Sequence, residues 1–226
     1  MKAKGFFCWF AKYKINVKKL YIDFLSVSGH KFHGPKGVGF LYKNKDFRIN
    51  KQIIGGKQQS DLRAGTINSP GIMAMATAAK DAYDNLSSNF NKLISLRNYT
   101  IELLLDIKKT HNNIIINTKE TCDFAPHIVS FGIKGVRAEV LLHSLEEYEI
   151  YVSAGSACSS HDKHISRTLK SIGLNDKEAE SIIRVSFSIY NSKDEIDNFI
   201  EKLNIILKKV IIMKYRYKNE EIKNKN

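Results

Sequence analysis

A strand, a glycine-rich turn and a second strand near the start of the chain constrain its fold most strongly. Residues 14–27 end in an apolar run, and residues 38–42 form a second one, Val-Gly-Phe-Leu-Tyr. The ten residues between these runs contain three glycines, and glycine marks turns between strands. Such an element presents the side chains of its turn at the edge of a sheet. Lys31 lies in this turn.

The rest of the chain alternates helical and strand patterns. We predict a helix over 69–109, with Ser69 as its N-cap, Pro70 at its first helical position and an interruption at 85–89. Further helices are predicted over 138–145, 165–172, 176–181 and 194–212, and strands over 114–116, 127–131, 150–152 and 183–187. Mixed strands and helices without an internal repeat predict an α/β fold.

Composition argues against several classes of protein. The formal charge is +13, but lysines are spread along the whole chain, and the one dense basic stretch, 208–225, is expected to be a solvated helix end and tail. We therefore expect no nucleic-acid partner. The longest apolar cluster near the start, 6–10, is too short to span a membrane and lacks the features of a secretory signal. We expect no membrane partner and a cytoplasmic location.

The three cysteines have different surroundings. Cys8, Cys122 and Cys158 share no metal-type spacing and include no Cys-x-x-Cys pair, so we expect neither a disulfide framework nor a metal site. Cys158 lies in a serine- and glycine-rich segment, which favours an exposed loop from which a nucleophilic thiol can reach a substrate and then a partner protein. Taken alone, an incidental surface cysteine is the simpler interpretation.

Lys31 is also ambiguous when taken alone. Lysine forms a Schiff base with an aldehyde only where its amine can lose a proton, but a lysine in a glycine-rich loop is more simply a surface residue. Its surroundings decide between the two interpretations. The string Ser-Gly-His-Lys at 28–31, followed by Gly-Pro-Lys-Gly-Val-Gly at 34–39, closely resembles the pyridoxal-phosphate (PLP) lysine segment of the cysteine desulfurases.

Three further segments resemble the same family in the same order. Residues 63–68, Arg-Ala-Gly-Thr-Ile-Asn, resemble its arginine-glycine-threonine segment. Residues 153–159, Ser-Ala-Gly-Ser-Ala-Cys-Ser, resemble the active-site cysteine loop of the group I branch. Residues 184–187, Arg-Val-Ser-Phe, resemble its carboxyl-terminal signature. These motifs identify the chain as similar to group I cysteine desulfurases of the class V aminotransferase family.

This resemblance implies a fold-type I PLP-dependent transferase. We expect a partial PLP-binding large domain over 1–88, a carboxyl-terminal small α+β domain with the cysteine loop over 89–213, and a basic tail over 214–226. Family members carry a long amino-terminal segment that supplies the histidine, aspartate and glutamine contacting the cofactor ring, whereas about thirty residues precede Lys31 here. We therefore expect a truncated chain with an incomplete cofactor pocket, and a homodimer if the protein is complete.

The resemblance also implies a reaction. Lys31 would hold PLP and move protons, and Cys158 would accept sulfur from L-cysteine as a persulfide, with release of alanine. The persulfide would pass to an iron–sulfur scaffold or another sulfur-acceptor protein.

Four binding residues follow from the same resemblance. Ser28 and His30 would bind the cofactor phosphate, and Thr66 would reach the phosphate of the other subunit's cofactor in a dimer. Arg184 would bind the substrate carboxylate, for which a bidentate guanidinium is suited.

Three alternatives stay open at this point. The chain could be a catalytically inactive remnant or a fragment that binds a sulfur-transfer partner. It could be a selenocysteine lyase or another class V aminotransferase, although the Gly-Ser-Ala-Cys-Ser loop at 155–159 disfavours this. A basic nucleic-acid module is the third, and it would require salt-sensitive binding.

Overall fold

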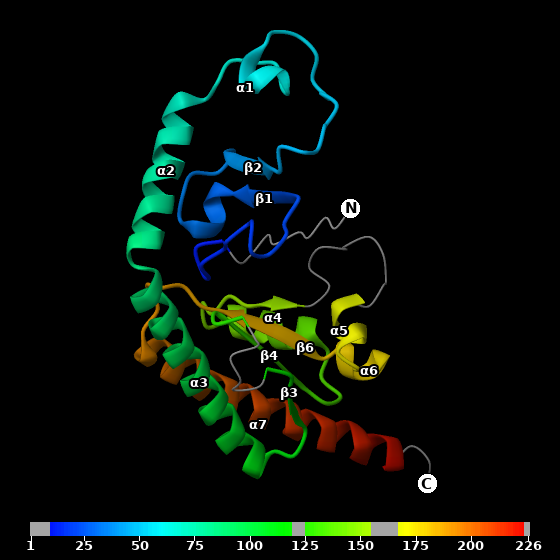
Figure 1. The fold of residues 1–226 in the computed structure, drawn as a ribbon. Helices are drawn as coiled ribbons and strands as arrows, with labels where there is room; N and C mark the ends of the chain where they lie inside the picture. Colours follow the sequence, from blue (N-terminus) through cyan, green and yellow to red (C-terminus); the bar gives the residue numbers. More distant parts are fainter. Residues whose placement is uncertain (1–9, 119–124, 155–166, 224–226) are drawn as a thin grey trace. The chain divides into compact units, whose positions relative to one another are not determined.

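The computed structural model describes residues 10–118, 125–154 and 167–223, and it divides the chain into two compact units, 1–91 and 92–226. Each unit has its own cluster of buried apolar side chains. Figure 1 shows the order of the elements along the chain. Within these residues, no helix has both the length and the apolar character needed to cross a membrane.

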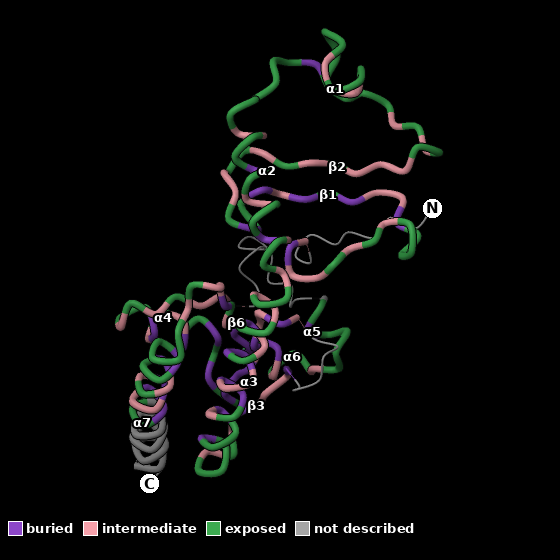
Figure 2. The backbone as a smooth tube through the Cα atoms, turned by 60° about the vertical axis from the view of Figure 1, so that its left-hand side comes forward, coloured by how far each residue is buried: buried purple, intermediate pink, exposed green. Residues whose placement is uncertain are grey.

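The first unit is built on the predicted strand–turn–strand element. β1 (Phe24–Ser28) pairs antiparallel with β2 (Gly39–Lys43), and the short 3-10 turn η1 (Gly29–Phe32) follows β1 directly. Side chains alternate between the two faces of a strand, so Leu25 and Val27 are buried while Ser26 between them is exposed. In Figure 2, buried stretches are visible along β1. The predicted element is confirmed.

Two helices follow the hairpin. α1 (Gln58–Asp61) is a single short turn, and α2 (Ser69–Asp84) buries Met75 and Ala82 in the apolar cluster of the first unit. The side chain of Asn68 accepts a hydrogen bond from the Gly71 amide at 3.1 Å, so Asn68 is the N-cap of α2. The predicted cap at Ser69 is wrong by one residue, because asparagine offers the same acceptor one position earlier.

The predicted interruption of the long helix is confirmed. α2 ends at Asn85, which has φ −102° and ψ 14°, and α3 (Leu86–Thr110) begins at the next residue. The Asn85 amide donates to the Asp81 carbonyl at 3.1 Å, which closes the last turn of α2. The buried positions of α3 repeat at helical spacing, as in Leu93, Leu96 and Leu104.

The second unit contains a four-stranded antiparallel sheet. Its order is β3 (Ile114–Ile116), β4 (Ile128–Ile133), β6 (Ile182–Ser186) and β5 (Ser153–Ala154). The predicted strand over 150–152 is wrong, since pairing begins only at Ser153. The Ile150 amide donates instead to the Leu145 carbonyl at 3.1 Å, so the end of the preceding helix holds this segment.

Beyond α3, the described residues of the second unit form four further helices. They are α4 (Ala138–Glu146), α5 (Arg167–Ser171), α6 (Asp176–Ala179) and α7 (Lys193–Lys223). α6 begins with a capping box, in which Asn175 and Glu178 each bond the other's backbone amide. α7 extends beyond the predicted end at residue 212.

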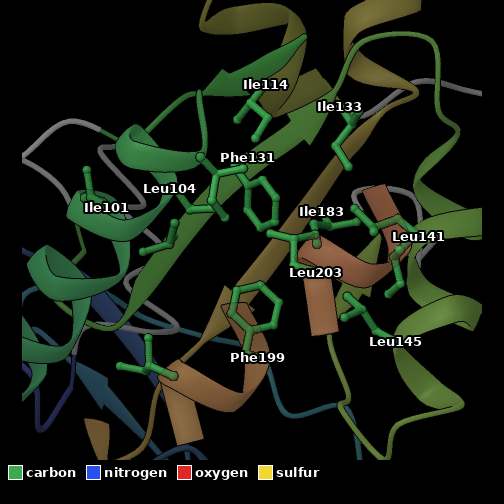
Figure 3. Packing of buried hydrophobic residues seen from close by; sticks show 14 of the residues in the cluster. Ile101, Leu104, Ile114, Phe131, Ile133, Leu141, Leu145, Ile183, Phe199 and Leu203 are labelled. Carbon is green, nitrogen blue, oxygen red and sulfur yellow. The ribbon is translucent and has the colours of Figure 1, made fainter. Parts of the chain in front are cut away.

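One face of the sheet forms the main core of the second unit. Figure 3 shows Phe131 and Ile183 from neighbouring strands among side chains of α3, α4 and α7. The rings of Phe131 and Phe199 lie 6.1 Å apart in an edge-on arrangement. Leu104 on α3 and Leu203 on α7 are both completely buried here, so this face is sealed by apolar contacts.

Leu104→Ala should lower the free energy of unfolding by about 2–5 kcal/mol, because it removes buried methyl groups and leaves a cavity. Leu105 is the next residue on α3 and is 42% exposed, so it offers a matched control. Leu105→Ala should change the free energy of unfolding by less than about 0.5 kcal/mol. Urea unfolding followed by circular dichroism measures both values, and equal losses would contradict the proposed core.

Candidate functional site

The turn that carries Lys31 is held from inside the first unit. Phe32 is 1% exposed, and its ring lies 4.9 Å from that of Phe10. The Gly29 amide donates to the Val38 carbonyl at 2.9 Å. Because Phe32 points into the core, the neighbouring His30 and Lys31 stand on the exposed side of the turn.

Crowding around Gly29 explains why the turn needs glycine at this position. A Cβ atom built on Gly29 would lie 3.1 Å from the Pro35 carbonyl oxygen, 3.2 Å from that of Val38 and 3.3 Å from the Met75 side chain. Two of these neighbours are backbone atoms, which yield little. The backbone at Pro35 and Val38 therefore packs closely against Gly29, and this contact holds the turn that carries Lys31.

Ser28 and His30 help to line a shallow depression of about 430 Å³ beside this turn. The rest of its lining comes from β1, from the end of the turn and from β2: Ser26, Val27, Gly37, Val38, Gly39, Phe40 and Leu41. The structure thus brings Ser28 and His30 together on one concave surface. Thr66 follows Gly65 in an exposed segment and is not part of this lining.

The sequence did not predict that Lys12, His33 and Asp81 interact near the turn. Partial desolvation and the charge of Lys12 lower the pKa of His33, and Asp81 opposes them. Burial also lowers the pKa of Lys12. His33 adopts the left-handed conformation, with φ 68°, and its amide bonds the Gly29 carbonyl, so it ends the turn. No sequence periodicity links positions 12, 33 and 81.

Arg184 belongs to the second unit. It lies on β6 with an exposed side chain, and its Nη2 donates to the Ser153 hydroxyl at 3.4 Å. Ser153 begins β5, the short strand that precedes Cys158 in the sequence. Cys158 itself, together with His161 and His164, lies outside the described residues.

The donors of the first unit fit part of PLP. A serine hydroxyl and a histidine N–H are suitable donors to phosphate, and the adjacent Lys31 amine suits an aldehyde. Among the described residues that line the depression, none carries a carboxylate that could pair with a pyridine nitrogen. The residues that line the depression therefore fit the phosphate end of the cofactor, and Lys31, exposed next to His30 but outside this lining, offers the amine for the aldehyde.

Across residues 10–118, 125–154 and 167–223, no three His, Cys, Asp or Glu side chains gather as metal ligands would.

Comparisons with known proteins agree with the motifs. Residues 9–199 match the family model described as "Aminotransferase class-V". A "Cysteine desulfurase" of Sinorhizobium fredii is 35% identical over 199 residues, which cover 88% of this chain and 50% of that protein. A "Cysteine desulfurase IscS" of Buchnera aphidicola is 37% identical over 195 residues, covering 85% of this chain and 46% of that protein.

A solved structure agrees as well. The X-ray structure of a NifS-like protein from Rickettsia africae matches with a TM-score of 0.78 and 30% identity, over 90% of this chain and 52% of that one. The chain spans about half the length of the curated relatives that it matches.

Lys12→Gln should raise the pKa of His33, because it removes one of the two influences that lower that pKa. Asp81→Asn should lower the same pKa further, since Asp81 favours the protonated ring. NMR titration of the His33 ring measures both changes. Lys14→Gln, which alters an exposed lysine two residues away from Lys12, serves as the control. Identical titrations in all three variants would show that these charges do not act on His33.

Acidification should weaken folding through the same residue. Because the pKa of His33 is lowered in the folded chain, the unfolded chain takes up a proton first as the pH falls below the ordinary histidine value of 6.5. The stability contributed by neutral His33 is complete above that pH and is lost progressively below it. His33→Asn, which tolerates the left-handed conformation, should reduce this loss in acid unfolding measurements.

Proposed function

Because the chain belongs to the class-V aminotransferase family, we propose that it carries the PLP lysine and the sulfur-accepting cysteine of a cysteine desulfurase. The substrate would be L-cysteine and the products L-alanine and a persulfide. The observation that carries this proposal is the crowded turn between β1 and β2, which holds Lys31 exposed beside Ser28 and His30. The names of the relatives support it.

Different residues of the turn would bind different parts of the cofactor. PLP, when bound, supplies an aldehyde for a lysine amine and a ring that withdraws electrons from the substrate. Ser28 Oγ and the His30 ring would bind its phosphate, with Lys31 Nζ at the aldehyde. Thr66 is exposed outside their depression, which suits the proposed role of binding the phosphate of a second subunit's cofactor in a dimer.

Proton transfer is assigned to Lys31. Its Nζ would take the proton from the substrate Cα and return a proton to the product carbon after sulfur has left. The base must reach both the substrate Cα and the carbon that carried sulfur. Lys31 suits this task because the backbone of its turn is held in place while its exposed side chain is flexible.

Arg184 and Cys158 would act on the other parts of the substrate. The Arg184 guanidinium would bind the carboxylate with two parallel hydrogen bonds. The Cys158 thiolate would attack the substrate sulfur, so that an S–S bond forms and the substrate C–S bond breaks. The carbon keeps the electron pair and takes a proton, which gives alanine. The persulfide would then pass to an iron–sulfur scaffold or another acceptor protein.

PLP added to the purified chain should give a new visible absorption band, because Lys31 Nζ would form a Schiff base with its aldehyde. Lys31→Ala should abolish this band, while Lys36→Ala should retain it. Lys36 is an exposed lysine of the same segment, and it is therefore a matched control. Absorption spectroscopy decides the outcome, and a band that survives Lys31→Ala would exclude Lys31 as the cofactor lysine. No band in the unsubstituted chain would exclude cofactor binding by this chain.

Incubation with PLP and L-cysteine should place a persulfide on Cys158 and release alanine. Alkylation followed by peptide mass spectrometry locates the persulfide. Cys158→Ser should abolish both products, whereas Cys122→Ser should leave them unchanged, since the Cys122 segment does not resemble the cysteine loop. A persulfide on Cys122, or alanine release without Cys158, would refute the assignment.

A further inference from the structure

An aromatic side chain near the start of the described residues packs against the turn that carries Lys31. The Phe10 ring contacts three other rings of the first unit, whose centres lie 4.9 Å (Phe32), 5.2 Å (Phe40) and 5.2 Å (Tyr83) away. These contacts have the tilted or edge-on geometry that aromatic pairs prefer. The three partners belong to η1, β2 and α2, so the Phe10 ring joins the three elements around the turn.

Phe32 connects this cluster to Lys31. The two residues are neighbours in η1, where Phe32 is buried and Lys31 is exposed. A close-packed interior leaves a buried side chain little room to shift, so the place of the Phe32 ring constrains the backbone of Lys31. The inner side of the turn therefore has two supports, which are Met75 against Gly29 and Phe10 against Phe32.

The backbone that follows Phe10 is strained. Ala11 has φ 60°, in the left-handed region that alanine rarely adopts, and its side chain is buried in the same apolar cluster. Such a residue persists only where its surroundings hold it in place. Tyr83 contacts the chain on both sides of Ala11, because its ring meets Phe10 and its oxygen forms a hydrogen bond with the Ile15 backbone. α2 therefore holds this segment where the Phe10 ring meets the turn.

The same segment also borders the end of the turn. Lys12 lies close enough to His33 for its charge to contribute to the lowered pKa of that ring. The His33 amide bonds the Gly29 carbonyl and so closes the turn. Residues 10–12 thus run beside the turn at both Phe32 and His33.

We propose that Phe10 is a positioning residue for Lys31. Its ring holds Phe32, and through Phe32 it holds the backbone of the turn, which keeps the Lys31 amine next to His30. The inference rests on the proposed function for the group that Lys31 binds, an aldehyde cofactor. It adds to that site a residue that acts only through the turn.

Hydrogen exchange tests this support without any cofactor. The Gly29 amide donates to the Val38 carbonyl at 2.9 Å and the Gly34 amide to the Gly29 carbonyl at 3.0 Å, so both amides report on the turn. All variants of the full chain are compared by NMR at equal free energy of unfolding, which urea adjusts. Phe10→Ala should speed exchange at both amides by roughly tenfold, because the turn opens locally more often. Phe10→Leu, which keeps a large apolar side chain, should restore most of the protection.

Phe47→Ala is the matched control. Phe47 is half-buried like Phe10, and its ring lies 5.5 Å from that of Phe24. Phe24 pairs with Lys43, at the end of the hairpin farthest from the turn. Loss of this ring contact should leave exchange at Gly29 and Gly34 unchanged under the same conditions.

PLP affinity gives the second measurement, by titration of the absorption band that depends on Lys31. Phe10→Ala should weaken PLP binding by roughly tenfold, because a displacement of about 1 Å can cost a reacting group up to about 10²-fold. Phe47→Ala should leave the affinity unchanged. Equal effects of Phe10→Ala and Phe47→Ala in either measurement would overturn the inference. If the unsubstituted chain gives no band, the proposed function fails, whereas exchange at Gly29 and Gly34 still decides whether Phe10 holds the turn.

Discussion

The pleat of β6 determines both what stabilises the second unit and what that unit presents to solvent. β6 pairs with β4 from Ile128↔Ser186 to Gly132↔Ile182, so its side chains alternate between two faces in a fixed register. Ile183 faces the apolar core, and Arg184 faces the opposite side. A slip of one residue would bury the arginine and expose the isoleucine. The core therefore holds the register, and the register places the arginine between two serines.

The turn of the first unit likewise has a buried inner side and an exposed outer side. Phe32 is buried and Gly29 is in contact with backbone carbonyls, so the turn is held on its inner side. The polar residues on its outer side, His30 and Lys31, are exposed. The buried residues Gly29 and Phe32 thus flank the exposed pair His30 and Lys31, so Lys31→Ala is expected to leave the turn folded.

Local sequence patterns predicted the features that depend on neighbouring residues. The hairpin and the position of Arg184 on a strand follow from apolar runs, glycines and motifs that span a few positions. The pairing of Ser130 with Arg184 could not be predicted, because the two residues are 54 positions apart and their register is encoded by no local pattern. The N-cap at Asn68 was missed by one residue, since neighbouring asparagine and serine are both good caps.

The net positive charge of the chain is distributed unequally between the two units. Residues 1–91 contain 15 lysines and arginines against five aspartates, whereas residues 92–226 contain 21 against 18 acidic residues. The surplus therefore arises mainly from a shortage of acids in the unit that carries Lys31. A positive potential of this kind attracts phosphate-bearing anions. The positive charge of the chain therefore lies mainly in the unit whose turn carries Ser28 and His30, where it would favour an anionic ligand.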